Sequence, residues 1–212
     1  NFLANGRGPL GRLLPLLQCV AFFVVGDFLL YWSHRLFHRR GLWPVHAIHH
    51  SPRDVDWTTA YRFHPLNFAL GPWLMTTVMI FLGVAPINII FVAPIEVAMA
   101  YFVHANLNVT LGPLKYLIAT PVFHRWHHAR RMPGDACNYG ANFALWDVAF
   151  GSFYLPADRL PADYGVEGDP VPENVLAQLV YPLKSWWVSF FYLQYRRGLD
   201  SLKEISKNGA RF

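Results

Sequence analysis

The ten histidines of this chain are clustered in the sequence. Eight of them lie in three short motifs: HRLFH over residues 34–38, HAIHH over 46–50 and HRWHH over 124–128. Residues three and four apart share one face of a helix, so each motif is expected to aim its imidazoles together. Imidazole is a good ligand for iron, zinc and copper. The spacing therefore predicts a metal site.

Chance does not account for the repeated HxxHH motif. At the histidine frequency of this chain, one such motif arises in about 2% of sequences and two in roughly 2 of 10,000. About four to six ligands saturate one metal ion, so eight imidazoles predict two ions. The eight histidines of the motifs are His34, His38, His46, His49, His50, His124, His127 and His128.

The rest of the sequence narrows the choice of metal. Cys19 and Cys137 lack the spacing of a structural zinc site, and HExxH of zinc proteases is absent. A haem needs only one or two axial ligands, and soluble di-iron bundles use glutamates that these motifs lack. An all-imidazole pair of irons remains for oxygen chemistry. Zinc can take the same sites in a purified preparation.

Three apolar segments must position these motifs: 13–32, 66–82 and 89–103. Their lengths suit membrane-crossing helices, and the last two predict a hairpin that turns near Pro86. Only 15% of residues are charged, against about 25% in a typical soluble domain. Buried core helices are the alternative. We expect an integral membrane protein with one domain over residues 1–212. Because the first residue is Asn1, the chain can also be a fragment.

Positive charge indicates which side of the membrane holds the histidines. The net charge is +5, and the arginines lie between the first two apolar segments and after the third, beside the motifs. The turn near Pro86 has no lysine or arginine. Positive segments face the cytosol, so the metal site is expected there, at a bacterial inner membrane or the endoplasmic reticulum. Beyond the charge itself, nothing indicates nucleic-acid binding.

Two later segments have less specific patterns. Residues 156–172 are rich in proline and predict a surface loop. Residues 175–202 predict a helix with several aromatic residues and flanking cations. Such a helix suits the membrane interface, although an ordinary packing helix is an equal alternative.

The motifs together resemble those of the fatty acid hydroxylase/sterol desaturase superfamily. HRLFH, HAIHH, RFHP, HANLN and HRWHH follow one another between apolar hairpins, and NYGANFALWDVAFGSFYLP resembles the stretch after the last motif in bacterial members. The resemblance covers about residues 26–156. It implies an all-α integral-membrane helical bundle with a cytosolic, histidine-rich cap that holds two metal ions. It also implies molecular oxygen and two electrons from an external donor.

The resemblance extends the set of metal ligands to all ten histidines. His104 matches an additional histidine after the hairpin, and His64 matches the histidine of a His-Pro element. Asn108 stands where some members have another histidine, and could hold a metal-bound water or support a ligand. Asp27 lies two helical turns before His34, where it could orient a ligand imidazole. We therefore take Asp27 and Asn108 as candidate catalytic residues that support the ligands. Asn138 and Asp147 are candidates for similar support.

These observations predict a membrane-bound di-iron oxygenase that hydroxylates or desaturates a C–H bond of a lipid, such as a sterol or fatty acyl chain. The substrate is expected to enter from the bilayer. Since no haem, flavin or nucleotide motif is present, electrons must come from a partner of the ferredoxin or cytochrome b5 type. Arg35, Arg39, Arg40, Arg130 and Arg131 could dock it or contact lipid headgroups. The alternatives are a membrane metal-binding or transport protein without redox catalysis, and an inactive homologue.

Overall fold

The computed structural model describes residues 7–131, 136–157, 159–168 and 170–190. The chain divides into two compact units, residues 1–171 and 172–212. Every named element of the described residues is a helix, which confirms the predicted all-α class. The single domain expected over residues 1–212 stays a prediction.

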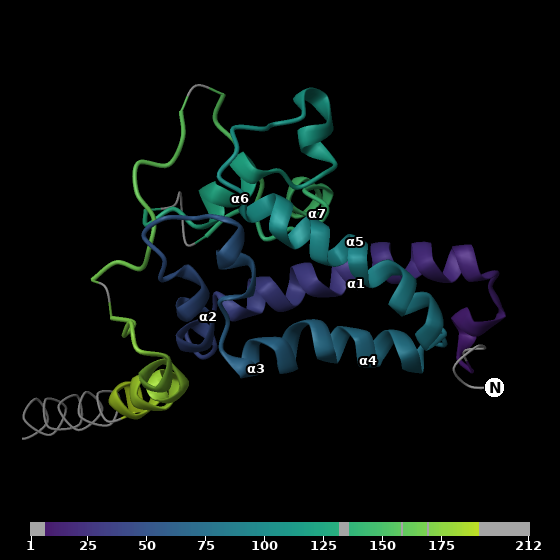
Figure 1. Ribbon diagram of the computed structural model, residues 1–212, viewed down its shortest axis with the longest axis horizontal. Coiled ribbons are helices and arrows are strands. Elements are labelled where there is room, and N and C mark those ends of the chain that lie inside the picture. The colour runs from purple at the N-terminus through teal and green to yellow at the C-terminus, as the bar shows by residue number, and fades with distance from the viewer. Residues whose placement is uncertain (1–6, 132–135, 158, 169, 191–212) are drawn as a thin grey trace, which may run out of the picture. The chain divides into compact units, whose positions relative to one another are not determined.

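The three apolar segments form the long helices of the first unit. Helix α1 spans Pro15–Phe37 and α5 spans Pro86–His104. Between them, α3 (Pro65–Phe68), η3 (Ala69–Trp73) and α4 (Leu74–Phe81) follow one another without a break. A proline in the first turn starts both long helices, where its missing N–H costs nothing. Helix α1 contacts both α4 and α5, and the three run side by side in Figure 1.

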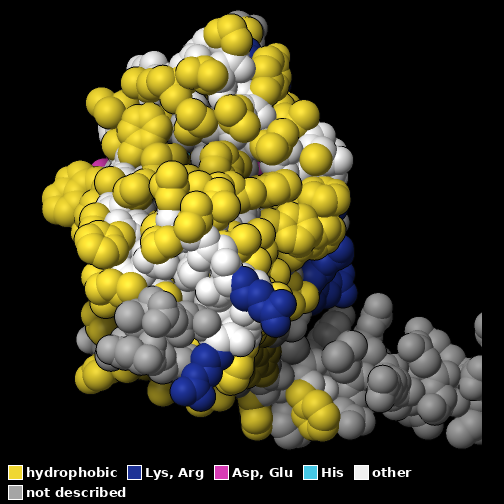
Figure 2. Space-filling model, turned by 90° about the vertical axis from the view of Figure 1, so that its right-hand side faces the viewer, with side chains coloured by type: hydrophobic (Ala, Val, Ile, Leu, Met, Phe, Trp, Pro, Cys, Tyr) yellow, Lys and Arg dark blue, Asp and Glu magenta, His cyan; other side chains and the backbone are white. Residues whose placement is uncertain are grey.

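Two of these helices are long and apolar enough to cross a membrane, by length and composition: α1 with 23 residues and α5 with 19. Only 28% of the apolar window of α1 and 17% of that of α5 is buried. A core helix of a soluble protein would be mostly buried, so the low burial argues against that alternative. Figure 2 shows the consequence, a face covered by hydrophobic side chains. Leu16 of α1 and Phe91 of α5 are among the exposed residues of these helices, as is Phe81 of the neighbouring α4.

The predicted hairpin turns at Leu82–Ala85, between α4 and α5. Gln18 of α1 fastens this turn, because its Oε1 accepts hydrogen bonds from Ala85 N at 2.8 Å and Asn88 Nδ2 at 2.9 Å. Gly83 has φ +107°, and a Cβ there would lie 2.6 Å from the backbone of Gly8. Only glycine satisfies both the left-handed conformation and the close approach. The turn and the start of α1 therefore form one end of the helical layer.

The segment before α4 contains one turn of π-helix, η3, with Pro72 inside it. A proline cannot donate to the backbone ladder, and a π-turn is a common way to absorb the disturbance. Such turns are frequent at functional sites. Gly71, Pro72 and Trp73 of this turn line the cavity described below.

Short helices gather beyond the C-terminal ends of α1 and α5 and carry two of the histidine motifs. Pro44 starts α2 and Pro121 starts α6, while the Thr120 hydroxyl caps α6 by accepting from Phe123 N. The remaining short helices precede α1, precede α3 or flank α6 in the sequence. The bounds of the short helices are η1 Pro9–Arg12, α2 Trp43–His50, η2 Trp57–Tyr61, η4 Gly112–Tyr116, α6 Pro121–His127 and α7 Leu145–Phe150.

The second unit contains a helix over residues 175–190. Its described part exposes apolar side chains, among them Leu176, Leu183 and Trp187. The rest of the helix predicted to residue 202 lies outside the described residues. Its place at a membrane interface, with ordinary packing as the equal alternative, stays a prediction. Within residues 156–172, the described part contains no helix, as predicted for a surface loop.

Candidate metal centre

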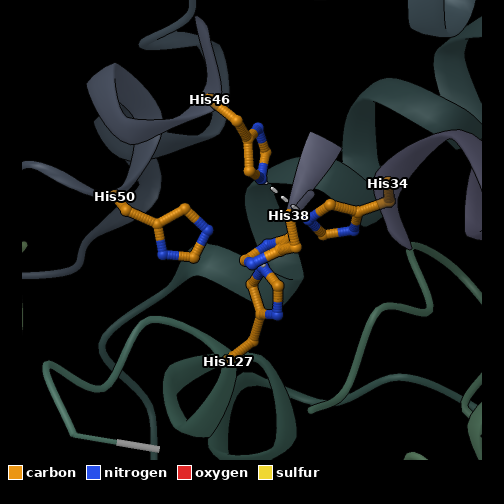
Figure 3. A group of neighbouring side chains, drawn as sticks. All are labelled: His34, His38, His46, His50 and His127. Atoms are coloured by element: carbon orange, nitrogen blue, oxygen red, sulfur yellow. Dashed lines mark hydrogen bonds between the residues drawn. The ribbon is translucent and has the colours of Figure 1, made fainter. Parts of the chain in front are cut away.

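Nine of the ten histidines come together in two groups. Within each group the possible ligand nitrogens all lie within 4.8 Å of one another, which is the separation expected around a single ion. The first group consists of His34, His38, His46, His50 and His127. The second consists of His49, His104, His124 and His128. Figure 3 shows the imidazoles of the first group pointing toward one another from separate segments of the chain. The residues are therefore suited to bind two metal ions.

Each HxxHH motif is divided between the two groups. In α2, His46 and His50 belong to the first group and His49 to the second. In the second motif, His124 and His128 belong to the second group and His127 to the first. The expectation that each motif directs all its imidazoles to one place was therefore too simple. The i and i+4 histidines converge, and the i+3 histidine serves the neighbouring group. The groups adjoin, since the rings of His50 and His128 stack with centroids 4.5 Å apart.

The first group has the nitrogen spacing of a coordination shell. The Nε2 atoms of His34 and His46 are 3.0 Å apart, and those of His38 and His127 are 3.3 Å apart. Ligands about 2.0–2.1 Å from an ion, at octahedral or tetrahedral angles, lie about 2.9–3.4 Å from each other. The observed distances fall in that range.

The partners of the opposite ring nitrogens fix the tautomers. His34 Nδ1 donates to the carbonyl of Tyr139 at 2.8 Å, and His127 Nδ1 donates to that of Cys137 at 2.7 Å. His46 Nδ1 lies 2.8 Å from Asn67 Oδ1. In a neutral imidazole whose Nδ1 donates, Nε2 carries a lone pair. The lone pairs of His34 and His46 therefore meet at 3.0 Å, an arrangement that a cation between them stabilises.

The second group repeats this spacing with fewer supports. His104 Nδ1 donates to Ala100 O at 2.7 Å, and His104 Nε2 lies 2.9 Å from His124 Nε2 and 3.3 Å from His49 Nε2. The Nδ1 atoms of His49, His124 and His128 are buried without a hydrogen-bond partner among the described residues. Buried polar atoms without partners are costly, so this group is not a self-sufficient structural cluster.

The environment keeps these imidazoles neutral. Burial lowers the pKa of the histidines outside the long helices well below the ordinary value, and charge repulsion from neighbouring imidazoles adds to the effect. The histidines concerned are His38, His46, His49, His50, His124, His127 and His128. A neutral imidazole is the form that binds a metal, so the site is prepared for cations.

Residues 137–140 supply the carbonyls that orient His34 and His127, and two side chains hold that segment in place. Asp147 accepts hydrogen bonds from Tyr139 N and Gly140 N, each at 2.7 Å. Asn138, in the left-handed conformation with φ 58°, donates to Phe123 O and accepts from Tyr154 N. Asn138 and Asp147 thus support the ligands through the backbone, in line with the role expected of them.

Asp27 does not orient an imidazole, and that expectation was wrong. Its carboxylate is fully buried and accepts hydrogen bonds from Asn142 N, Phe143 N and Trp146 Nε1. The helical spacing from His34 is real, but a backbone loop occupies the position where a ligand ring was expected. Asp27 fastens the loop before α7 to the middle of α1.

Asn108 also has a different role from the predicted one. It is exposed, and its Oδ1 accepts a hydrogen bond at 2.6 Å from Arg125, a buried residue of the last histidine motif. Arg125 further donates to Asn106 Oδ1 and Leu107 O, each at 3.0 Å. Asn108 therefore helps hold Arg125, and with it α6, in place, and it belongs to neither histidine group.

His64 lies outside both groups. Its Nδ1 accepts a hydrogen bond from Leu66 N at 3.1 Å, so the ring caps the start of α3. Asn67, three residues later, instead contacts His46 of the first histidine group, and the sequence did not predict this contact. The available signal in the sequence was a lone asparagine near the start of the apolar segment 66–82, and the structure shows that its side chain is buried.

A largely apolar cavity of about 520 Å³ reaches both histidine groups. Its walls come from α1, from the segment around η3 and from α5. His34 and His46 of the first group line it, as do His49, His104 and His124 of the second. The lining also includes exposed Tyr61 of η2 and Trp73 of η3, so the cavity reaches the surface at these residues. A hydrocarbon chain can therefore reach the metal-binding nitrogens from the apolar side of the molecule.

The predicted arginines occupy two different settings. Arg35, Arg39 and Arg40 line a polar depression together with His38 and Tyr139. Arg130 pairs with Asp163 at 3.3 Å, and Arg131 approaches Glu167 at 4.0 Å. Arg130 and Arg131 thus pair with acidic residues of the predicted loop over 156–172. Arg35, Arg39 and Arg40 instead lie beside His38 of the first histidine group.

A model of the family described as fatty acid hydroxylase matches residues 19–152, which include most of α1, all of α5 and all nine grouped histidines. The chain belongs to the fatty acid hydroxylase family. Its two histidine groups are thus found in the part of the chain that defines the family. No solved structure matches the chain.

Several relatives of this chain are lipid-modifying enzymes by name. Ornithine lipid hydroxylase OlsE of Rhizobium tropici is 33% identical over 167 residues, covering 78% of this chain and 50% of that protein. Alkylglycerol monooxygenase of Xenopus tropicalis is 31% identical over 177 residues, covering 77% of this chain and 33% of that protein. The human alkylglycerol monooxygenase is 30% identical, with 80% and 37% covered. The chain spans half or less of the length of these relatives.

Proposed function

We propose that this protein is a membrane-bound di-iron oxygenase that uses molecular oxygen and two external electrons to hydroxylate a C–H bond of a lipid. The observation that carries the proposal is the meeting of two all-imidazole groups at one end of an apolar cavity. Nine neutral imidazoles suit two irons, and no sulfur or carboxylate belongs to either group among the described residues. When bound, the irons would supply the activation of oxygen.

The protein's own residues contribute position and exclusion of water. Tyr139 O, Cys137 O and Asn67 hold three ligand rings in one tautomer. The cavity would bring a hydrocarbon chain to His34 and His104, which both line it. Its apolar walls keep water away from the reacting carbon, which favours attack on the lipid over side reactions.

The relatives favour a polar lipid over a free hydrocarbon. Their names record an ornithine lipid in one case and an alkylglycerol in the others. We infer a substrate with a polar head and a long chain, taken from the bilayer. Hydroxylation is the outcome these names favour, and desaturation is the alternative outcome of the same attack.

The electron donor is proposed to be an acidic ferredoxin or cytochrome b5-type protein. Arg35, Arg39 and Arg40 form the cationic surface nearest the first histidine group. Arg35 lies in the last turn of α1, and Arg39 and Arg40 follow its end, on the side that the distribution of positive charge assigns to the cytosol. Docking there would place a donor beside His38.

Heavy-isotope oxygen gas tests the proposal. Cells expressing the chain would be grown under it, and their lipid extract compared by mass spectrometry with that of cells expressing His124→Ala. We expect a lipid that gains one heavy oxygen atom only with the wild-type chain. A lipid that loses two hydrogens without gaining oxygen would show desaturation. The assay would then be repeated with purified, iron-loaded protein, a reducing donor system and the same lipid extract. No change in any lipid in that assay would overturn the proposal.

A metal transport protein is the competing function. Metal exchange of the purified protein distinguishes the two functions. An oxygenase retains iron against a mild chelator, whereas a transporter exchanges it. Transport requires ligands along a path through the membrane spans. Here His34 and His104 lie near or at the C-terminal ends of α1 and α5, and His38 directly follows α1. The other six grouped histidines lie in or next to the short helices α2 and α6.

A further inference from the structure

The cavity contains one acidic side chain in its otherwise apolar middle. Among its described lining residues, Glu96 of α5 is the only carboxyl group. Its neighbours on the same wall are Ala93, Val97 and Ala100. An ionisable residue within an apolar, membrane-length helix is costly, and it is a functional candidate for that reason.

One of the two carboxyl oxygens of Glu96 already accepts a hydrogen bond. Oε2 accepts a hydrogen bond from Asn142 Nδ2 at 2.8 Å, and Asn142 is itself held by Asp27 through its backbone N–H at 2.9 Å. Oε1 is buried and has no hydrogen-bond partner among the described residues. One carboxyl oxygen is thus fixed by the loop that Asp27 fastens, and the other is available to a molecule in the cavity.

The position of Glu96 relative to the metal-binding end is set by α5. Glu96, Ala100 and His104 follow one another at intervals of four residues along one face of the helix, and all three line the cavity. Eight residues of helix correspond to a rise of about 12 Å. A molecule that reaches from Glu96 to the histidines would therefore place an atom at a defined distance along its chain beside the metals.

We propose that Glu96 is a specificity-determining residue that binds a hydroxyl group of the lipid substrate and so selects which carbon faces the metal centre. The proposal rests on the proposed function, since it concerns the lipid of that reaction. A hydroxyl group suits this position because it can donate to a carboxylate and accept from a carboxylic acid. A plain hydrocarbon would leave Oε1 buried and unpaired, at a cost that disfavours it.

Photolabelling tests this binding without turnover. Two probes would be compared on the whole purified protein in lipid nanodiscs: hexadecanol carrying a diazirine in its chain, and the methyl ether of the same compound, which cannot donate. We expect the alcohol to label the cavity roughly 2- to 10-fold more than the ether, the ratio that one hydrogen bond supports. Glu96→Gln keeps a hydrogen-bonding group and should retain most of this preference. Glu96→Leu should abolish it.

Phe91→Leu is the matched control, because Phe91 lies on the exposed face of α5 and does not line the cavity. It should label like the wild type. Equal labelling by the two probes in the wild type, or an unchanged preference in Glu96→Leu, would overturn the proposal. The wild-type ratio decides even where Glu96→Leu fails to accumulate.

Failure of this proposal can be told apart from failure of the proposed oxygenase function. If the protein oxidises lipid but labels with both probes equally, only the role of Glu96 is wrong. If the alcohol is preferred but no lipid is oxidised, the hydroxyl-binding role of Glu96 stands and the oxygenase function is wrong. For an active enzyme, Glu96→Leu should in addition broaden the set of carbons oxidised, whereas a purely structural loss would lower all products together.

Discussion

At the scale of single residues, the partner of each imidazole matters as much as the imidazole itself. The motifs predicted eight of the nine grouped histidines, and the resemblance added His104. Asn67 and the carbonyls of Cys137 and Tyr139 could not be predicted in the same way. Carbonyls carry no sequence signal, and the contact of Asn67 with His46 depends on how α3 packs against α2.

His46, which belongs to the first histidine group, and His64, which belongs to neither group, can be compared directly. His46→Ala should reduce the bound metal from two ions per chain to about one, because the first group loses a ligand that faces His34. His64→Ala should retain both ions, because its ring caps α3. Metal analysis of both purified variants checks this. Loss of an ion in His64→Ala would return His64 to the ligand set.

Asn67 is expected to act on metal affinity through His46. Asn67→Leu removes the acceptor of the His46 Nδ1 proton, and losses of this kind weaken metal binding by about 10- to 100-fold. Asn67→Asp keeps an acceptor and should bind metal as tightly as the wild type or more so. Competition with a chelator of known affinity measures both. Equal affinity in the leucine variant would contradict the role assigned to Asn67.

At the level of helices, hydrophobic patterning located the three long apolar segments but did not show which parts of the chain pack against them. The apolar runs over 13–32, 66–82 and 89–103 predicted α1, the continuous α3–η3–α4 segment and α5, since length and composition are local properties, although α1 continues to Phe37. The role of Asp27 was mispredicted, because periodicity shows only which residues share a helix face. The loop at 142–146 that occupies that face is distant in sequence by more than a hundred residues.

Asp27 is therefore expected to matter for stability. Asp27→Leu leaves Asn142 N, Phe143 N and the Trp146 indole N–H without their acceptor. Each unsatisfied buried donor costs about 1–3 kcal/mol, so the variant should lose several kcal/mol of unfolding free energy. Urea titration of the metal-free protein in detergent measures the loss. A matched substitution at an exposed position, Val20→Ala, should leave the urea midpoint nearly unchanged, and an unchanged midpoint in Asp27→Leu would refute this assignment.

At the scale of the whole molecule, the buried histidines couple stability to pH. Seven of them outside the long helices have a pKa well below the ordinary 6.5, so below about pH 6.5 the unfolded chain binds protons that the folded chain does not. Stability of the metal-free protein should fall as the pH falls through that value. Burial raises the pKa of Asp147 to about 6, which acts in the opposite sense between pH 6 and 4, but as one group against seven. Urea midpoints at pH 7.5, 6.5 and 5.5 provide the check, and a midpoint that rises on acidification would contradict it.

The orientation of the molecule in the membrane follows from the same arrangement. Cysteines placed at Arg40 and at Ile87 mark the histidine end and the hairpin end. The substituted residue 40 should react with an impermeant maleimide only when the cytosolic side is accessible, and residue 87 only from the other side. Cys19→Ser and Cys137→Ala in the background remove the native thiols. Reaction of both positions from one side would rule out a membrane-crossing arrangement.

The proposed function requires two metal ions held by imidazoles alone. Iron X-ray absorption of the purified, iron-loaded protein, combined with the iron content per chain, tests this most directly. We predict two irons per chain and a ligand shell of nitrogen and oxygen with the outer scattering of several imidazole rings. A single iron per chain, or a sulfur atom among its ligands, would contradict the two-metal centre built from these nine histidines.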